Sequence, residues 1–472
     1  MDRPIAIDLF AGCGGMSLGL EAAGFDIAAA VEFDAIHSLV HHVNFPYCAT
    51  ICRDLVTVTA TELRATIGHR EIDLIAGGPP CQGFSVMGKR IFEDPRNGLI
   101  YEYLRLIREL QPKYFIFENV PGLAKGKQRL FLEQLITEFQ QAGYGLTEPI
   151  QVLNSANYGV AQNRQRLIIL GHRWDMPSLV YPEFSHSSVI NHSIIDHSIT
   201  NNSVTDHYDY SQIEPNSPRQ TALDLGFSDS LNSIKLPLCT VEQVLGDLAT
   251  IPPFVGKDHG IPREKLHYPQ EKMFKLCHRR HPTNHEQDLV WGHIGSDHKS
   301  EIQARFAATP IGTVDPQSRF FKLDPQGQCH TLRAGTNRDR GAHTAPRPIH
   351  YIAPRCITIR EAARLHSFPD WFLFHQTIWH GFRQIGNAVT PLLAYGVGTA
   401  VIQALKIPTN DLVIRDLPVV DRNLLRYNIQ QASAYWGIDE VTIAKRQRQP
   451  ARPRSSTKII TEITTEPDCA CN

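Results

Sequence analysis

The segment IAIDLFAGCGGMSLGLEAAG (residues 5–24) decides the fold class, because an apolar strand passes through glycines directly into a helix. IAIDLFA (5–11) is a continuous apolar run typical of a buried strand. GMSLGLEAAG (15–24) has helical spacing and ends at a glycine, and DIAAAVEF (26–33) follows as a second strand. A strand, a helix and a strand in this order predict a βαβ unit and a parallel sheet.

The same alternation continues to about residue 172 and extends the predicted sheet. Continuous apolar strands separated by helices indicate a mostly parallel sheet covered on both faces, so the fold class is α/β and doubly wound. Further strands are predicted at 72–78, 113–120 and 164–172, and further helices at 35–44, 99–110 and 129–143.

Composition limits the classes of protein to consider. The 472 residues include 47 Lys plus Arg against 48 Asp plus Glu, a net charge of -1, so any site for a polyanion must be a local patch. The ten cysteines have no paired C-x-x-C spacing, which argues against a disulfide framework or a zinc site and favours a reducing cytoplasm. There is no signal-peptide organisation and no apolar run of about 20 residues, so we expect no membrane contact.

The chain changes in character after residue 173. NHSII DHSIT NNSVT DHYDY (191–210) repeats every five residues, but so few turns cannot bury a solenoid core, and a surface insertion with little fixed structure is expected. We predict a first domain at 1–173, a low-complexity insertion at 174–234, a loop-dominated second domain at 235–347, a return to the first domain at 348–407, and a C-terminal extension at 408–472, basic and partly disordered.

The glycine-rich segment DLFAGCGG (8–15) lies between a predicted strand and helix, where backbone amides can face a ligand. It lacks the Gly-x-Gly-x-x-Gly pattern, which disfavours a nicotinamide dehydrogenase, and a simple tight turn remains an alternative. Glu32 ends the next strand, the position where such folds hold ribose hydroxyls. Asp54 could accept a hydrogen bond from an adenine amino group, or could be only a turn residue.

Cys81 stands in GGPPCQGFS (77–85), a segment that can be neither helix nor strand. It could be a buried core residue, a metal ligand or a nucleophile. The prolines fix the backbone, the glycines permit close approach of another molecule, and the loop follows the carboxyl end of a predicted strand. With no set of His or Cys ligands nearby, we expect no metal, and a nucleophile on a rigid loop is favoured.

Three charged residues are candidates to share a pocket with Cys81. Glu118 ends the next strand, in FENV (117–120), so both residues are expected at the same rim of the sheet, although a helix-capping role for Glu118 is an alternative. Arg164 and Arg166 alternate in QNRQR (162–166) and are expected to face the same side, suited to a phosphate or a base carbonyl. A solvated edge is the alternative for this pair.

Taken together, six motifs resemble those of the cytosine-5 DNA methyltransferase family of the bacterial type. They are DLFAGCGGMSLGLEAAGF, GGPPCQGFS, FENVPGL, QNRQRLIILG, REAARLHSFPDWF and QIGNAVTPLLAYGVG, and they cover residues 4–172 and about 348–405 in the family's order. The resemblance implies a Rossmann-like class I methyltransferase domain that binds S-adenosyl-L-methionine, with a small target-recognition domain inserted before the last motifs.

The resemblance also implies roles for individual residues. The Cys81 thiolate would add to carbon 6 of a flipped-out cytosine, and Glu118 would lie against ring nitrogen 3 and the amino group. Arg166 would contact the base carbonyl and Arg164 would lie near the flipped nucleotide. Gln82 and Ser85 are candidates for DNA contacts. The implied cofactor contacts come from both ends of the chain: Phe10, Gly12, Gly14, Glu32, Phe33, Asp54, Asn387 and Val389. The C-terminal helix would therefore pack beside the N-terminal strand.

Partners follow from the same resemblance. The substrate would be a specific sequence in double-stranded DNA, read by clusters such as HRRH (278–281) and TLRAGTNRDRGAHTAPRP (331–348). We expect a monomer in the bacterial cytoplasm, associated with the nucleoid, serving a restriction-modification system with a cognate endonuclease or acting alone. His366 stands where the family usually has glutamine, and we expect little consequence.

Two rival functions remain open. A tRNA cytosine-5 methyltransferase has the same fold, but QGFS (82–85) resembles the DNA-modifying form. An inactive member acting as a DNA-binding scaffold is disfavoured because the candidate catalytic residues are all present. Methylation assays on duplex DNA and on tRNA distinguish these functions.

Overall fold

The computed structural model describes residues 3–68, 70–80, 98–126, 128–187, 235–268, 279–280, 288–335, 347–408 and 415–438. Several sequence predictions fall outside these ranges. They concern Cys81, Gln82 and Ser85, the pentad repeat at 191–210, the ends of HRRH (278–281), residues 336–346 and the basic stretch at 445–458.

The central sheet has the strand order β3-β2-β1-β4-β5-β9-β6, with β7 also paired to β9. Strands β1 to β5 are parallel, whereas β9 runs antiparallel to β5 and pairs antiparallel with β6 and β7. The mostly parallel α/β sheet predicted from the sequence is confirmed. Its strands are β1 (Ile5–Leu9), β2 (Asp26–Glu32), β3 (Ala49–Cys52), β4 (Leu74–Gly77), β5 (Tyr114–Asn119), β6 (Tyr144–Leu146), β7 (Gln151–Asn154) and β9 (Gln165–Arg173).

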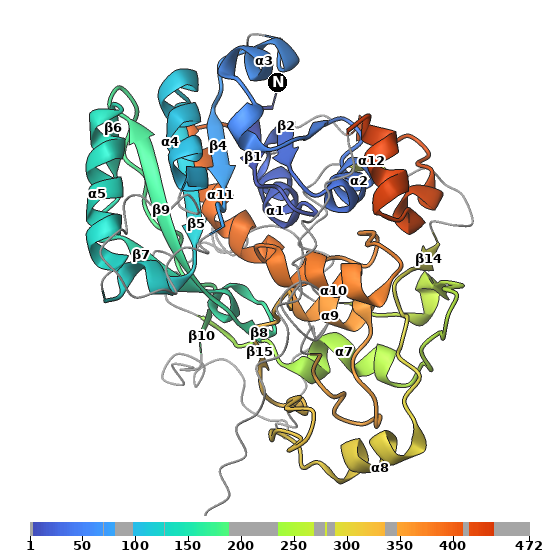
Figure 1. The fold of residues 1–472 in the computed structure, drawn as a ribbon. Helices are drawn as coiled ribbons and strands as arrows, with labels where there is room; N and C mark the ends of the chain where they lie inside the picture. Colours follow the sequence, from blue (N-terminus) through green and yellow to red (C-terminus); the bar gives the residue numbers. More distant parts are fainter. Residues whose placement is uncertain are drawn as a thin grey trace, which may run out of the picture.

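Helices cover both faces of the sheet because successive strand residues point to opposite sides (Figure 1). In β1, Ile5, Ile7 and Leu9 belong to one hydrophobic core, while Ala6 belongs to the other. The first core packs against α3 (Ala60–Thr66), α4 (Gly98–Leu110) and α5 (Gln128–Gln141), and the second against α1 (Gly15–Ala23), α2 (Ala35–Asn44) and α11 (Pro391–Leu405).

The strand order reverses between β1 and β4, since β2 and β3 lie on one side and β5 on the other. In doubly wound folds ligands bind outside the carboxyl ends of the strands at such a reversal. The glycine turn follows β1, and Gly78 to Pro80 follow β4, so both candidate loops leave the sheet at this point.

The end of the chain packs against its first helix. A Cβ at Gly15 would lie 2.9 Å from Ala388 Cβ, and one at Gly19 would lie 2.5 Å from the backbone nitrogen of Tyr395. Both glycines therefore allow close contact of α1 with α11 and the residues just before it. The helix that the sequence predicted beside the N-terminal strand thus contacts α1, which directly follows that strand.

The described part of residues 235–347 contains little regular structure. Its helices are α7 (Val241–Ala249), η9 (Arg263–Lys265) and α8 (Ser300–Ala308). Its two-residue strands pair with one another or with distant segments: β11 (Leu236–Pro237) with β10 (His186–Ser187), β12 (Ile261–Pro262) with β14 (Leu289–Val290), β13 (Arg279–Arg280) with β16 (Arg415–Asp416), and β15 (Cys329–His330) with β8 (Gln162–Asn163).

Part of the C-terminal extension folds against the first domain. After β16 come η12 (Arg422–Arg426) and α12 (Ile429–Trp436). The Trp436 Nε1–H donates to the carbonyl of Ala35 at 3.1 Å, and His375 Nε2 lies 3.0 Å from the Tyr427 carbonyl. The first of these contacts joins α12 to α2, and the two helices lie side by side in Figure 1.

The stretch Ile378–Leu405, which contains α10 (Ile378–Asn387) and α11, meets the length and hydropathy of a membrane span. However, 67% of its most apolar window is buried inside the fold. Its apolar character is therefore accounted for by packing in the core.

Candidate active site

The glycine turn after β1 is held by the carboxylate of Glu32. Glu32 Oε2 accepts the Gly12 amide at 2.8 Å, and Glu32 Oε1 accepts the Asp34 amide at 2.8 Å. Phe10, Gly12 and Gly14 all have positive φ, of 64°, 57° and 102°. Gly12 and Gly14 adopt such backbone conformations readily, whereas Phe10 is a non-glycine residue in the same region. The amides of Gly12 and Asp34 orient the Glu32 carboxylate.

The space around this turn differs from one glycine to the next. A Cβ at Gly12 would meet no heavy atom within 4 Å, so a ligand can approach the backbone there. A Cβ at Gly14 would meet the ring of Phe45. Gly12 is therefore the open position of the turn and Gly14 a packed one.

Two other candidates for the adenine side lie in different environments. Phe33 is 50% exposed although it is aromatic, which leaves a ring face available to a ligand. Asp54 caps the 3-10 helix η1 (Leu55–Thr57), since its Oδ1 accepts the Val56 amide at 3.1 Å. The structure thus shows Asp54 in the turn role that the sequence left as an alternative.

The last cofactor candidates stand where α10 ends. Asn387 is exposed, whereas Val389 is buried and its backbone carbonyl faces Gly15 of α1. The structure therefore places Val389, from the later part of the chain, against Gly15 at the start of α1.

A chain of hydrogen bonds between buried side chains joins the strand before the glycine turn to the helix after it. The Ser17 hydroxyl donates to Asp8 Oδ2 at 2.6 Å and lies 3.0 Å from His41 Nε2, and His41 Nδ1 lies 3.2 Å from the Thr50 hydroxyl. Burial raises the pKa of the Asp8 carboxyl to about 7, although hydrogen bonds from Ser17 act in the opposite direction. This chain links β1, α1, α2 and β3.

Asp8 should make the stability of the protein depend on pH. Because its folded-state pKa lies above the unfolded value of 3.8, the folded carboxyl binds its proton more tightly, and this stabilisation is lost as pH rises toward 7. The free energy of unfolding of wild type, relative to Asp8→Asn, is expected to fall between about pH 5 and about pH 7. Urea unfolding of both proteins across this range tests it, and parallel curves would contradict the raised pKa.

Glu118 and Arg166 form an ion pair at the carboxyl end of β5. Arg166 Nε donates to Glu118 Oε1 at 2.6 Å, and the two side chains are only 13% and 12% exposed. The Arg166 Nη1 group also donates to the carbonyl of Gln165 at 2.7 Å. A partly buried carboxyl and a guanidinium are thus fixed side by side, a combination suited to a planar base with a carbonyl and an amino group.

The chain leading to Cys81 is held against this pair. A Cβ at Gly78 would lie 2.6 Å from Glu118 Oε2, so only glycine leaves that carboxylate its place. The Asn119 side-chain amide donates to the Pro79 carbonyl at 3.1 Å. The loop after β4 is therefore attached to the end of β5 up to the point where the described residues stop.

The cysteines that the structure describes are poorly suited to act as nucleophiles. Six of the ten are described, and all six are buried: Cys13, Cys48, Cys52, Cys239, Cys329 and Cys356. Burial raises the pKa of Cys52 and of Cys356 to about 11, which keeps both as thiols at neutral pH. Cys81 is among the other four, and its placement lies outside the described residues.

Arg164 lies in the interior rather than along the rim. Its side chain is 2% exposed, and its Nη1 and Nη2 groups donate to the carbonyls of Leu332, Gly386 and Ala388, each at 2.9 Å. Burial lowers its pKa well below the usual value, and the nearby Arg166 charge lowers it further. The two arginines are thus neighbours, but these backbone carbonyls already engage both terminal nitrogens of Arg164.

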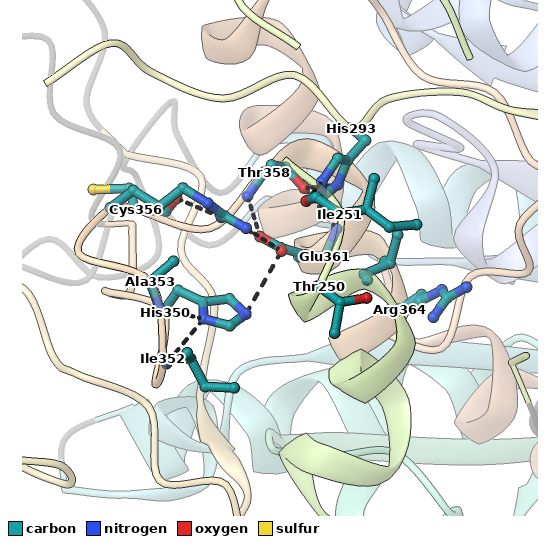
Figure 2. Close-up of polar contacts among 12 residues, drawn as sticks. Thr250, Ile251, His293, His350, Ile352, Ala353, Cys356, Thr358, Glu361 and Arg364 are labelled. Atoms are coloured by element: carbon teal, nitrogen blue, oxygen red, sulfur yellow. Dashed lines mark hydrogen bonds and ion pairs between the residues drawn. The ribbon is translucent and has the colours of Figure 1, made fainter. Parts of the chain in front are cut away.

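Sequence reasoning missed a buried charged cluster on α9 (Ile359–Leu365). Arg355 donates to both carboxylate oxygens of Glu361 at 2.8 Å, and the Thr358 amide donates to Glu361 at 2.7 Å. Figure 2 shows His350 facing the same carboxylate, 3.7 Å away. Burial alone would raise the pKa of Glu361, but Arg355 outweighs it and lowers the pKa to about 2.

Helix α9 itself carries two buried arginines. Arg364 binds Asp370 and Asp247, and Arg360 donates to three backbone carbonyls, including that of Trp291. Because His293, Asp247 and Trp291 belong to the second region of the chain, α9 connects that region to the first domain. The charged residues within REAARL (360–365) were the available signal, since they interrupt an otherwise apolar helix.

Among the residues that the structure describes, no group of three or more His, Cys, Asp or Glu side chains is arranged to hold a metal ion. The described polar groups at the carboxyl edge of the sheet include the Glu32 carboxylate, held by two backbone amides, and the pair of Glu118 with Arg166.

Comparison with known proteins gives a consistent result. The profile of the C-5 cytosine-specific DNA methylase family matches residues 5–403. The type II methyltransferase M.XorII of Xanthomonas oryzae pv. oryzae is 43% identical over 460 residues, which is 96% of this chain and 97% of that protein. M.DdeI of Desulfomicrobium norvegicum is 30% identical and covers 82% of this chain and 86% of its own length.

A solved structure agrees with these sequence relatives. A prophage-encoded DNA modification methyltransferase from E. coli has a TM-score of 0.60 and 29% identity, and the match covers 86% of this chain and all of that one. The chain belongs to the C-5 cytosine-specific DNA methylase family and is a DNA (cytosine-5-)-methyltransferase.

Proposed function

We propose that the protein transfers a methyl group from S-adenosyl-L-methionine to carbon 5 of a flipped-out cytosine within a specific duplex sequence, and that Cys81 is the nucleophile. The observation that carries this proposal is the Glu118–Arg166 pair, with Oε1 to Nε at 2.6 Å, packed against Gly78 three residues before Cys81. A carboxyl and a guanidinium fixed beside the residues that lead to Cys81 match the groups that activation of a cytosine ring requires.

The residues around the glycine turn fit the proposed methyl donor. Gly12 leaves open space, Phe33 offers an exposed ring face, and the Glu32 carboxylate is already oriented by two amides. Glu32 would accept hydrogen bonds from the ribose hydroxyls, and Phe10, Gly14, Asp54, Asn387 and Val389 would complete the surroundings. When bound, S-adenosyl-L-methionine supplies an electrophilic methyl group on a sulfonium sulfur.

Glu32→Gln should weaken cofactor binding. Glutamine keeps the shape of the side chain, but its amide nitrogen cannot accept a hydrogen bond. Either the Gly12 amide or the Asp34 amide would therefore lose its acceptor. The dissociation constant for S-adenosyl-L-methionine is expected to rise about tenfold, equivalent to about 1.4 kcal/mol. Calorimetric titration measures it. Glu62→Gln is the control, since Glu62 also accepts a backbone amide but lies on the exposed α3 cap, and an equal loss there would refute the assignment.

The chemistry begins at the cytosine ring. The Cys81 sulfur forms a bond to carbon 6, and the electron pair of the carbon 5–carbon 6 double bond moves toward carbon 5 and ring nitrogen 3. Glu118 lies against nitrogen 3 and the amino group, where it can hold the proton that neutralises the developing charge. Arg166 contacts the ring carbonyl and keeps Glu118 in place through their ion pair.

Carbon 5 would then form the new bond to the methyl group as the bond between the methyl group and the sulfonium sulfur breaks, which leaves S-adenosylhomocysteine as a neutral thioether. The carbon 5 proton passes to a water molecule, the electron pair of that carbon–hydrogen bond restores the double bond, and the sulfur–carbon 6 bond breaks to release the Cys81 thiolate. Because carbon 6 is covered by neighbouring bases in stacked DNA, the target nucleotide must rotate out of the duplex. Gln82 and Ser85 would contact the DNA around it.

Target choice is assigned to the second region, residues 235–347, which α9 connects to the first domain. The type II names of the relatives support a role in restriction-modification. We further propose a cognate endonuclease as partner and a monomeric protein in the bacterial cytoplasm at the nucleoid.

Expression in a host free of cytosine methylation tests this function. Bisulfite sequencing of the host genome should show 5-methylcytosine at one recurring sequence, and purified protein should label duplex DNA carrying that sequence but not tRNA. Labelling of tRNA alone would establish the tRNA enzyme, and specific DNA binding without any methylation would establish the scaffold.

A further inference from the structure

The buried guanidinium of Arg164 joins two segments that are far apart in sequence. Its Nη1 donates to the carbonyl of Leu332, and its Nη2 donates to those of Gly386 and Ala388, each at 2.9 Å. Leu332 belongs to residues 331–335, the described start of the candidate DNA-reading cluster, called here the recognition segment. Gly386 and Ala388 flank Asn387 in residues 386–389, called here the cofactor segment.

Gln162 and His366 connect the same two segments by a second route. Gln162 Oε1 accepts the Leu332 amide at 3.0 Å, and Gln162 Nε2 lies 3.1 Å from His366 Nδ1. His366 Nε2 lies 3.0 Å from the Ala388 carbonyl, the same oxygen that Arg164 binds. Since the amide of Gln162 donates to Nδ1, the ring hydrogen of His366 is on Nε2 and donates to Ala388.

The protonation of His366 supports this arrangement. Burial lowers its pKa well below the usual value, and the Arg164 charge adds to the effect, so the ring is neutral. The charged groups that face it are Arg164 and Arg166. The neutral ring can accept a hydrogen bond from Gln162, which binds the recognition segment, and at the same time donate one to Ala388 of the cofactor segment.

The two segments also touch directly. A Cβ at Gly386 would lie 2.7 Å from the Cα of Ala334 and 2.5 Å from the carbonyl carbon of Arg333. The backbone of the recognition segment therefore rests on the end of α10, where only glycine leaves room. A displacement of one segment must displace the other or break the bonds to a buried charge, which is costly.

We propose that Arg164 and His366 are positioning residues that couple the recognition segment to the cofactor segment, so that cognate DNA and cofactor strengthen each other's binding. This inference rests on the proposed function, because it assigns DNA to one segment and S-adenosyl-L-methionine to the other. It gives Arg164 a role that requires no contact with the nucleotide, and it gives His366 a role that the family's usual glutamine can reproduce.

The experiment measures the coupling itself. The dissociation constant of S-adenosylhomocysteine, the unreactive product, is determined by calorimetry with and without a short duplex carrying the mapped methylation site. The ratio of the two constants is the coupling factor, and reciprocal linkage requires the same factor for DNA. In the wild type a factor of about 5 or more is expected. In Arg164→Met and in His366→Leu it should fall to about 1.

His366→Gln should rescue the coupling. A glutamine amide can donate to the Ala388 carbonyl while its oxygen accepts from Gln162, so the factor is expected to stay near that of the wild type. A purely structural histidine would not be replaced in this selective way.

Arg360→Met is the matched control. Arg360 is also fully buried and donates to three backbone carbonyls, those of Trp291, Pro369 and Phe372, at 2.7, 3.0 and 2.7 Å. It contacts neither segment through these bonds. Its replacement should lower the midpoint of urea unfolding about as much as Arg164→Met does, yet leave the coupling factor unchanged.

The outcomes are distinct. A wild-type factor of 1, an unchanged factor in Arg164→Met and His366→Leu, or an equal loss in Arg360→Met overturns the inference. If Arg164→Met does not fold, His366→Leu with its glutamine rescue decides the matter alone. Failure of the proposed function would appear differently, as a wild-type protein that neither methylates nor selectively binds duplex DNA.

Discussion

Cys81→Ser is expected to lower the rate of methyl transfer by about 10⁴-fold or more while leaving DNA binding intact. A serine hydroxyl is almost entirely protonated at neutral pH, so it cannot add to carbon 6 as a thiolate does. The substitution replaces the sulfur atom with oxygen and leaves the contacts of the described residues unchanged. Transfer of labelled methyl groups to a duplex with the mapped site measures the rate, and a gel-shift titration measures binding.

A covalent readout separates this role from a structural one. A duplex with 5-fluorocytosine at the target position blocks loss of the carbon 5 substituent after methylation, so the sulfur–carbon 6 bond should persist through a denaturing gel. Wild-type protein should form this adduct and Cys81→Ser should not. Cys52→Ser is the control, since Cys52 is buried and burial raises its pKa to about 11. An adduct that persists in Cys81→Ser, or that disappears in Cys52→Ser, would contradict the assignment.

Glu118→Gln should lower turnover by about 10² to 10³-fold, the range seen when one preorganised group that stabilises a transition state is removed. Glutamine preserves the shape and can still accept a bond from Arg166, but it cannot hold a proton against ring nitrogen 3. Single-turnover methylation at saturating DNA measures the chemical step. The dissociation constant of S-adenosyl-L-methionine should not change, because Glu32 is assigned to that ligand.

Asn119→Ala supplies the comparison on the same strand. Its amide holds the Pro79 carbonyl at 3.1 Å but reaches no reacting atom in the proposed mechanism, so its loss should loosen the Cys81 loop and slow turnover less than Glu118→Gln does. Turnover in Glu118→Gln that equals or exceeds that of Asn119→Ala would remove Glu118 from the chemical step.

The sheet and the glycine turn after β1 could be predicted because their signals are local. Strand residues such as Ile5 to Leu9 are buried on both faces and therefore form continuous apolar runs, and Gly78 is required by a neighbour at the end of the next strand. Parallel strands bring their carboxyl ends together, so Glu32 and Glu118 were both expected at one edge.

The environment of Arg164 could not be read from the sequence. Its three acceptors are the backbone carbonyls of Leu332, Gly386 and Ala388. Because every residue has a backbone carbonyl, the sequence does not indicate which carbonyls will accept from a buried arginine. The buried Arg355–Glu361 pair was missed for a different reason: the charges of REAARL (360–365) are visible in the sequence, but charged residues in a helix normally indicate a solvated face. Residues 415–438 were predicted as part of a partly disordered extension because of the basic, proline-containing stretch at 445–458. The contact of Trp436 with Ala35 of α2 joins residues 401 positions apart, which no local pattern indicates.

The contact of α1 with α11 also has a consequence for synthesis of the protein. Helix α1 is made within the first 23 residues, but α11, which packs on it, is completed only at Leu405. Residues up to Leu405 must therefore leave the ribosome before the apolar face of α1 is covered and Val389 reaches its place beside Gly15. Long-range closure of this kind slows folding and prolongs exposure of apolar surface, so the newly made enzyme should depend on chaperones until α11 docks.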